Sequence, residues 1–430
     1  MGQPQINIYR REGGLGRVGD NERNWSALCM NGVAVTDLVD LNTVYELNNV
    51  NDAVALGLDA AYDTSNLMLV HYHIKEFFRM CPTGKLFIML VSQTVTLTQM
   101  ADLATTYGLA KLLRDPLCEG KVRQAAIALN PEANYTPTYA DDIDDDCLKV
   151  TGSTYGGAVV KAQALAEEER VLKRPVHIFV EGRLDPDMAS NTLIEAVEAA
   201  SPKVQLVALQ DYDVANTDST FENHAAVGTV LGYRANIGLS PSLANPAQGS
   251  IQNGATGDFV NPALSSHKVL THYSDTLNGD MDVIYDKGFI IPRVHQNYPG
   301  VYLNSDRTCV DTTNDYARGS NNMVANEAER IIYNYFVPKL DADVKVDKNT
   351  GKLAPVVVNA WQAGVTQVLK AGLEGSDQDN SGDVSSVEAY INPNQNFLST
   401  DTISVEAEIV PKGYAKTIKV YVGFKNPFKK

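Results

Sequence analysis

The chain has 430 residues, of which 44% are hydrophobic and 20% are charged, a composition typical of globular proteins that bury a sizeable core. The formal net charge of −16 argues against nucleic-acid binding by the chain as a whole, because such binding needs a basic surface. No apolar run approaches the roughly 20 residues that cross a bilayer, and the N-terminus lacks the basic and apolar regions of a signal peptide. We therefore expect no nucleic-acid partner and no membrane span.

Cysteine usage indicates a reducing compartment such as a cytoplasm. The five cysteines are widely spaced and form no CxxC pair, so the sequence predicts neither a zinc site nor a disulfide framework. They are Cys29, Cys81, Cys118, Cys147 and Cys309.

The N-terminal segment combines a short strand pattern with a glycine-rich stretch. Residues 5–10 alternate apolar and polar side chains, and residues 13–24 are poor in hydrophobic residues. The glycines from Gly14 to Gly19 match GxGxxG, but a dinucleotide site would also need a helix opening on the last glycine. Residues 20–24 offer no apolar helical face. We therefore interpret the segment as a strand on a flexible tether.

Strand and helix patterns alternate through the next two hundred residues. After short strands and turns over 28–46, strands are predicted at 85–91, 122–129, 176–180 and 204–209, and helices at 67–79, 98–114, 155–173, 192–200 and 221–235. This alternation predicts an α/β layer with a mostly parallel sheet and flanking helices.

The composition then changes and indicates a second, α+β domain near the C-terminus. Residues 239–264 form a long irregular segment, residues 281–291 have a strand pattern, and helices are predicted at 322–340 and 354–371. We expect four parts: an N-terminal arm over 1–27, an α/β domain over 28–275, an α+β domain over 276–400, and C-terminal strands or an arm over 401–430.

Period-two alternation of β-branched residues dominates the last thirty residues and is typical of half-buried strands. Two runs, 403–409 and 418–424, are separated by Pro411 and Gly413. Because isolated terminal strands are marginal alone, we predict that residues 1–12 and 402–424 add to sheets of neighbouring chains. The apolar residues expected to make these inter-subunit contacts are Ile6, Ile8, Ile403, Val405, Ile418, Val420, Val422 and Phe424.

A polar stretch before the terminal strands matches part of a calcium loop. The candidate ligands are Asp377, Asp379, Ser381, Asp383 and Glu388. A helix precedes the stretch, but the exiting helix of the motif is missing, since residues 390–393 have the pattern of a strand end or turn. The alternative is a polar loop between a helix and a strand, with no metal bound, and this is the interpretation we favour.

No other cluster of residues indicates catalysis. The acidic residues between Asp141 and Asp146 suggest a solvated loop, because like charges repel. The seven histidines form no HExxH motif, and the chain has no GxSxG elbow and no Walker A loop. An α/β enzyme would need a site in the loops after Val91, Val180 or Leu209. We therefore predict no enzymatic activity and no cofactor.

Several segments together resemble the contractile tail sheath family of phage tails and related injection machines, in its short sheath-like branch. The resemblance rests on INIYRREGGLGRVG near the N-terminus, YPGVY at 298–302, DYAR at 315–318, the helix 322–340, QNFLST at 395–400 and GYAKTIKVYVGF at 413–424. The order of these segments carries the likeness, which is best over the last 130 residues.

The resemblance implies a structural subunit without enzymatic activity. In that family, hexameric rings stack helically around an inner tube, and the terminal arms of one subunit add strands to the C-terminal domain of others. Contraction then drives the tube through a target envelope. The implied partners are further copies of the chain, the tube protein, and baseplate and tail terminator proteins. The implied location is a virion tail or injection particle assembled in the bacterial cytoplasm. The alternatives are an α/β enzyme and a calcium-binding module.

Overall fold

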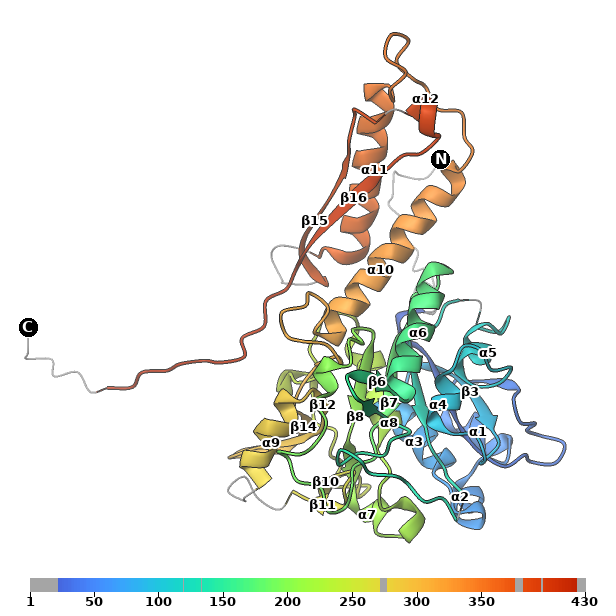
Figure 1. Ribbon diagram of the computed structural model, residues 1–430, viewed down its shortest axis with the longest axis vertical. Helices are drawn as coiled ribbons and strands as arrows, with labels where there is room; N and C mark the ends of the chain where they lie inside the picture. The colour runs from blue at the N-terminus through green and yellow to red at the C-terminus, as the bar shows by residue number, and fades with distance from the viewer. Residues whose placement is uncertain are drawn as a thin grey trace, which may run out of the picture. The chain divides into compact units, whose positions relative to one another are not determined.

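The computed structural model describes residues 22–118, 120–132, 134–270, 277–375, 382–395 and 397–423. The chain forms two compact units (Figure 1). The first unit contains the chain up to Gly238 together with Leu243–Gly319, and the second contains Leu239–Ser242 together with the chain from Ser320 onward.

A seven-stranded sheet forms the centre of the first unit. Its strands are β1 (Trp25–Asn31), β2 (Val44–Leu47), β3 (Lys85–Val91), β4 (Gln124–Ala128), β7 (His177–Glu181), β8 (Val204–Val207) and β12 (Phe289–Ile290). The strand order is β12-β8-β7-β4-β1-β3-β2, and only β2 runs antiparallel to its neighbour. The central strands are buried on both faces because their residues are almost continuously apolar. The predicted α/β class with a mostly parallel sheet is confirmed.

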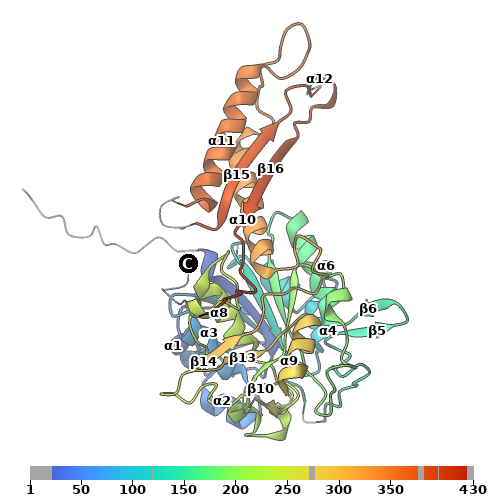
Figure 2. The same ribbon diagram turned by 90° about the vertical axis from the view of Figure 1, so that its left-hand side faces the viewer.

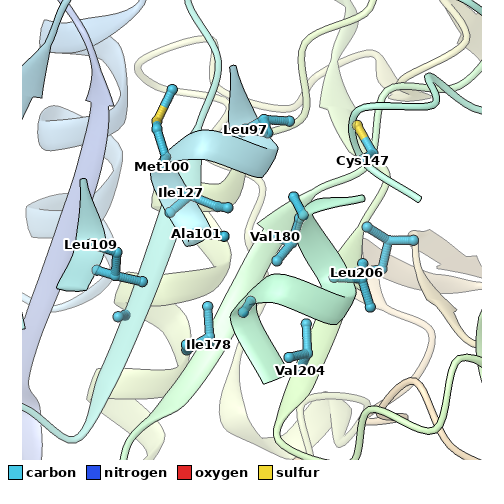
Figure 3. Packing of buried hydrophobic residues seen from close by; sticks show 14 of the residues in the cluster. Leu97, Met100, Ala101, Leu109, Ile127, Cys147, Ile178, Val180, Val204 and Leu206 are labelled. Atoms are coloured by element: carbon cyan, nitrogen blue, oxygen red, sulfur yellow. The ribbon is translucent and has the colours of Figure 1, made fainter. Parts of the chain in front are cut away.

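Helices cover both faces of this sheet. They are α1 (Val50–Ala55), α2 (Ala60–Asn66), α3 (Val70–Met80), α4 (Leu97–Ala101), α5 (Leu109–Leu113), α6 (Ala158–Val171), α8 (Val227–Ile237) and α9 (Leu277–Asp286). One apolar cluster joins the sheet to α4, α5 and α6, and a second joins its other face to α3 and α8. Figure 3 shows residues of the first cluster, with Met100 of α4 and Leu109 of α5 beside Ile127 of β4.

Two glycines allow α3 and α8 to pack unusually closely. A Cβ atom on Gly228 would lie 2.4 Å from the carbonyl oxygen of His73, and one on Gly232 would lie 2.4 Å from that of Phe77. Both contacts are with the backbone of α3, which cannot move aside as a flexible side chain could. The GxxxG spacing in α8 therefore sets the distance between these two helices.

Short elements complete the first unit. They are η1 (Glu22–Asn24), β5 (Lys149–Thr151), β6 (Thr154–Gly156), η2 (Ala196–Glu198), β9 (Leu209–Asp211), α7 (Tyr212–Ala215), η3 (Ser219–Phe221), η4 (Pro246–Gln248), β10 (Pro262–Leu264), β11 (Lys268–Val269), β13 (Pro292–His295) and β14 (Tyr298–Leu303). The pairs β5–β6 and β13–β14 are two-stranded sheets, and β9, β10 and β11 form a three-stranded one.

The second unit packs two long helices against a two-stranded antiparallel sheet (Figures 1 and 2). Its elements are α10 (Gly319–Phe336), η5 (Val337–Lys339), α11 (Pro355–Leu373), β15 (Val384–Ile391), α12 (Phe397–Thr400) and β16 (Val405–Pro411). Met323 and Ala328 of α10 and Val365 of α11 meet Val387 and Ala389 of β15 in one core. The predicted helices at 322–340 and 354–371 correspond to α10 and α11.

The division into units differs from the predicted boundary between residues 275 and 276. β12 pairs with β8 inside the central sheet. Arg234 of α8 and Asp306 form a fully buried ion pair, with Nη2 and Oδ1 2.6 Å apart. These contacts attach residues 277–319 to the first unit, so α10 is the first long element of the second.

The predicted helix 98–114 is wrong, because the structure has two short helices there, α4 and α5. Gly108 lies between them with φ of 86°, a conformation that glycine adopts without strain. A Cβ atom on Gly108 would lie 2.6 Å from the carbonyl oxygen of Met100. The chain therefore turns back on α4 where the apolar spacing suggested a continuous helix.

The predicted helix 192–200 is also wrong, and only η2 forms. The side chain of Thr192 donates to Asp142 instead of capping a helix, and Nζ of Lys287 donates to the carbonyl oxygen of Leu193. Tertiary contacts thus hold this segment in an irregular conformation.

The predicted strand over 281–291 is mostly helix α9, and only Phe289–Ile290 pairs as β12. Ile284 is fully buried, and Met281, one helical turn earlier, packs on the same cluster. Residues three apart lie on the same face of a helix, so these apolar residues follow a helical period. The segment is too short for its sequence pattern to distinguish a helix from a strand.

Candidate assembly interface

The C-terminal segment of the chain is anchored at its base on the second unit. After β16, the hydroxyl of Tyr414 donates to the carbonyl oxygen of Ser240 at 2.6 Å and lies 3.0 Å from Oγ of Ser320. These contacts fix where the segment leaves the sheet. The nine residues from 415 to 423 could then span about 30 Å if fully extended.

Residues 417–423 form no strand within this chain and are exposed. The exposed fractions of Ile418, Val420 and Val422 are 78%, 75% and 93%. Single exposed apolar residues are common on protein surfaces, but three on alternate positions of one extended segment are a strand face without a core. We call residues 417–423 the C-terminal strand segment. Phe424 lies outside the described residues, as do Ile6 and Ile8.

The other predicted inter-subunit residues lie in the chain's own second unit. Val405 opens β16 and is directly opposite Ile391 of β15. Ile403 is half-buried and packs on a small cluster that contains Leu353 and Val358. The two runs of alternating residues therefore differ: the first forms an internal hairpin-like pair with β15, and the second has no strand partner among the described residues.

The candidate calcium loop is divided by the start of β15. Asp377, Asp379 and Ser381 lie outside the described residues. The carboxylate of Asp383 accepts a hydrogen bond from the N–H of Ser240 at 3.3 Å. Glu388 lies in the middle of β15 with its side chain exposed. Within the part of the chain that the structure describes, no three His, Cys, Asp or Glu side chains lie close enough to hold a metal ion.

The carboxyl ends of the parallel strands are where an open α/β sheet would hold a ligand, at the switch point beside β1. Here the chain's own side chains occupy this edge. Nδ2 of Asn31 donates to the carbonyl oxygens of Ser92 at 2.8 Å and Val95 at 2.7 Å. The side chain of Asn130 donates to the carbonyl oxygen of Asn31 at 3.0 Å. These bonds join the loops after β1, β3 and β4.

The next loops along the edge are tied together by carboxylates. Glu181 is buried and accepts from the main-chain N–H groups of Leu129 at 2.5 Å and Ala225 at 3.0 Å, and it pairs with Arg183 at 3.2 Å. Burial raises the pKa of Glu181. Burial also raises the pKa of Asp211, to about 6, while its carboxylate accepts a main-chain N–H at 2.8 Å. These acidic groups hold the loops in place by accepting main-chain hydrogen bonds. They therefore have a structural role at the edge of the sheet where an enzyme of this fold would place catalytic or binding residues.

The acidic stretch after Asp141 is not the solvated loop that we predicted. Asp144 is buried and accepts from the hydroxyl of Tyr135 at 2.5 Å. Asp146 accepts from the N–H groups of Leu97 at 2.6 Å and Thr98 at 3.1 Å, at the N-terminus of α4. The stretch is acidic because its carboxylates bind main-chain donors of neighbouring elements.

Family models match the chain along nearly its whole length. The model described as DUF2586, N-terminal domain, matches residues 3–307, and the model described as DUF2586, C-terminal domain, matches residues 315–429. The chain belongs to the DUF2586 family. A comparison with curated proteins found no match. The two family domains meet between residues 307 and 315, close to the division between the compact units of this DUF2586 protein.

Solved structures of contractile sheath proteins share the fold of the DUF2586 chain. The anti-feeding prophage helical sheath in its contracted state matches with a TM-score of 0.56 at 10% identity, covering 99% of this chain and 100% of that one. A chain of the anti-feeding prophage baseplate matches with a TM-score of 0.57 at 10% identity, covering 99% of each. The contracted sheath complex of the extracellular injection system PVC matches with a TM-score of 0.55 at 13% identity, covering 99% and 98%. The fold expected from the sheath resemblance is confirmed.

Two features of the DUF2586 interface were missed at the sequence level. β15 was not predicted as a strand, although Val387, Ala389 and Ile391 alternate with polar residues. The calcium-like pattern overlaps the start of this strand, and the segment was therefore interpreted as a loop. The anchoring role of Tyr414 had no sequence signal, because its partners Ser240 and Ser320 are distant in the chain. In the described residues, no helix is both long and apolar enough to cross a membrane.

Proposed function

We propose that this chain is a structural subunit of a contractile sheath, which polymerises around an inner tube and contracts to drive the tube through a target envelope. One observation carries the proposal. The chain shares its fold with sheath proteins over 99% of its length, and its C-terminal strand segment is exposed and has no partner strand in the described chain. A free strand face of this kind suits strand addition to another subunit.

In this proposal, subunits are linked by their terminal arms. The chain before η1 and the chain after β16 form the two arms, because the predicted arm boundary at residue 27 falls inside the buried strand β1. Ile418, Val420 and Val422 bury their side chains in a neighbouring subunit. Ile6 and Ile8 act in the same way from the N-terminal arm. The subunits form hexameric rings that stack helically, with the tube, baseplate and tail terminator proteins as partners. The assembly belongs to a virion tail or injection particle, built in the bacterial cytoplasm.

The proposed subunit performs no catalysis and needs no cofactor. The hydrogen-bonded asparagines and buried carboxylates at the carboxyl edge of the central sheet support this, because they are engaged in holding loops together. The sheath instead acts mechanically. An extended array in which some subunit contacts are not yet made would release free energy when contraction makes them.

Negative-stain electron microscopy of the purified full-length chain tests the proposal. We expect rings or tubes. Removing residues 1–16 should leave a folded protein that no longer forms long tubes, because one of the two arms is lost while the described units are untouched. Compact, monodisperse particles of the full-length chain, or tight stoichiometric retention of a nucleotide or flavin through purification, would contradict the proposed function.

A further inference from the structure

The two ends of the parallel sheet in the first unit carry opposite charge. The segments that follow β1, β3, β4, β7 and β8 contain fourteen Asp and Glu residues and one arginine, and are 32–43, 92–96, 129–148, 182–190 and 208–226. The segments that lead into the same strands contain eight Lys and Arg residues and three acidic residues, and are 22–25, 81–85, 114–124, 172–177 and 199–204. We call these two surfaces the acidic end and the basic end of the first unit.

Helix dipoles account for only part of this separation. α5 and α6 both end at the basic end, where the negative ends of their dipoles favour cations, and Asp146 accepts main-chain bonds at the N-terminus of α4. A dipole acts within about one turn of the helix terminus. Four exposed carboxylates of the acidic end lie outside any helix, and no ion pair to them is present among the described residues. They belong to Asp37, Asp40, Glu132 and Asp187.

The basic end has a positive excess where α5 and α6 end. Arg114 and Arg174 share the buried carboxylate of Glu169, with N–O distances of 2.7 Å and 2.8 Å. Two cations on one carboxylate leave a net positive charge. In the same segments, Lys111 and Lys173 are exposed, and within the described chain neither forms an ion pair. These two lysines therefore present their charges to solvent or to another molecule.

The basic end also places two lysines on one tryptophan. Nζ of Lys85 and Nζ of Lys121 lie 4.3 Å and 5.1 Å from the ring centroid of Trp25. The two ammonium groups are thus closer together than the Debye length of about 10 Å at 0.1 M salt, and they repel each other. Glu46 pairs with Lys85 at 2.9 Å. An anionic surface arriving at this end would lower the remaining repulsion.

We propose that the acidic end of the first unit in one copy of the chain docks on the basic end of the first unit in the next copy. The two surfaces lie at opposite ends of one sheet, so the contact is head-to-tail and repeats from copy to copy. Docking of an end on the same end of another copy would bring like charges together, which is costly. This inference rests on the proposed function, and it adds to the terminal arms an ionic contact between the bodies of the subunits.

Charge reversal at each end of the full-length chain tests the contact. The basic-end variant carries Lys111→Glu and Lys173→Glu, and the acidic-end variant carries Glu132→Lys and Asp187→Lys. The matched control, Lys345→Glu with Lys348→Glu, changes the net charge as much as the basic-end variant does, at exposed positions of the second unit. Thermal melting below the assembly concentration checks that each variant is folded, and sedimentation over a concentration series measures assembly.

Each end variant alone brings its reversed side chains against like charges of the next copy. We therefore expect each to need an at least roughly tenfold higher concentration to assemble, and the control to assemble as the wild type does. In an equimolar mixture of the two end variants, alternating subunits restore opposite charges at every contact. The mixture should therefore assemble close to the wild-type concentration, which a change in net charge or a local defect in one variant would not produce.

Four results would overturn the inference and leave the sheath function standing, because wild-type tubes still form in each case. They are normal assembly of either end variant, failure of the mixture, an equal loss in the control, and a loss confined to the acidic-end variant. The last result would assign the acidic end to another basic surface, such as the lysines over 412–423. Failure of the wild-type chain to assemble would overturn both proposals.

Discussion

Val422→Asp separates the contribution of the C-terminal strand segment to assembly from its contribution to the fold. Val422 is 93% exposed in the chain, so its replacement removes almost no burial from the isolated subunit. Surface substitutions of this kind change the free energy of unfolding by about 0.5 kcal/mol or less. We therefore expect the variant subunit to melt within a degree or two of the wild type.

Assembly should respond quite differently to the same substitution. Burying a valine side chain contributes about 1.5–3 kcal/mol, and a buried carboxylate without a partner adds a desolvation cost. A loss of only about 2 kcal/mol per strand corresponds to a roughly 30-fold weaker contact. Each subunit would donate one such strand, so the concentration needed for assembly should rise by at least this factor. Lys419→Glu, on the opposite face, should raise it about fivefold or less, the equivalent of about 1 kcal/mol.

Two measurements separate the effect of Val422→Asp on subunit stability from its effect on assembly. The first is thermal melting below the assembly concentration, and the second is sedimentation over a concentration series above it. A fall of several degrees in the melting temperature of Val422→Asp monomers would mean that the segment folds back on its own chain. Normal sedimentation of that variant would show that the segment contributes nothing to assembly. Either result would refute the reasoning from its exposure.

Three further predictions concern the first unit, and each is checked by thermal melting of the unassembled subunit. Gly232→Ala places a Cβ atom 2.4 Å from the backbone of α3 and should cost about 1–3 kcal/mol, whereas Gly254→Ala meets nothing within 4 Å and should be neutral. Asp306→Ala removes the buried carboxylate paired with Arg234 and should lower the free energy of unfolding by about 3–5 kcal/mol. A loss below about 1 kcal/mol would contradict the expectation that the variant leaves a buried, unpaired charge. Burial lowers the pKa of His177 to about 4, so the unfolded chain takes up a proton first as the pH falls below about 6.5. Wild-type stability should therefore fall between pH 6.5 and 4 more steeply than that of His177→Gln, and equal slopes would exclude a neutral buried imidazole.

The central sheet could be predicted from the sequence because buried parallel strands have a simple pattern. The run over Lys85–Val91 is apolar from Leu86 onward, and the structure forms β3 with the same bounds. The predicted helices at 67–79 and 155–173 also appear, as α3 and α6, since the first has an amphipathic spacing and the second is rich in alanine. Local sequence patterns were sufficient to predict an element wherever the pattern of buried residues came from that element alone.

The predictions that were wrong concern segments whose local conformation depends on residues far away in the sequence. The helix predicted over 192–200 does not form because Asp142, fifty positions before Thr192, binds the hydroxyl of that residue. The apolar residues of α9 were assigned to a strand because a short run fits either period. In the assembly interface, the alternation of Ile418, Val420 and Val422 was visible in the sequence. The hydrogen bonds that the main-chain N–H groups of β15 donate to side chains of α11 were not, because they depend on two separate segments of the chain meeting in space.

The last prediction concerns the calcium-like stretch, whose match to a binding loop is contradicted by the geometry of β15. A calcium loop must curl so that its first and twelfth positions reach one ion at about 2.3–2.6 Å. Here the chain is already extended from Val384, and four residues of strand carry Glu388 about 13 Å along β15. There its exposed carboxylate is opposite Glu408 in the sheet, so it cannot converge with Asp383. Calorimetry should therefore show no calcium binding tighter than about millimolar, and Glu388→Ala should change nothing. Micromolar binding that Glu388→Ala abolishes would mean that β15 unpairs to close a loop around the ion.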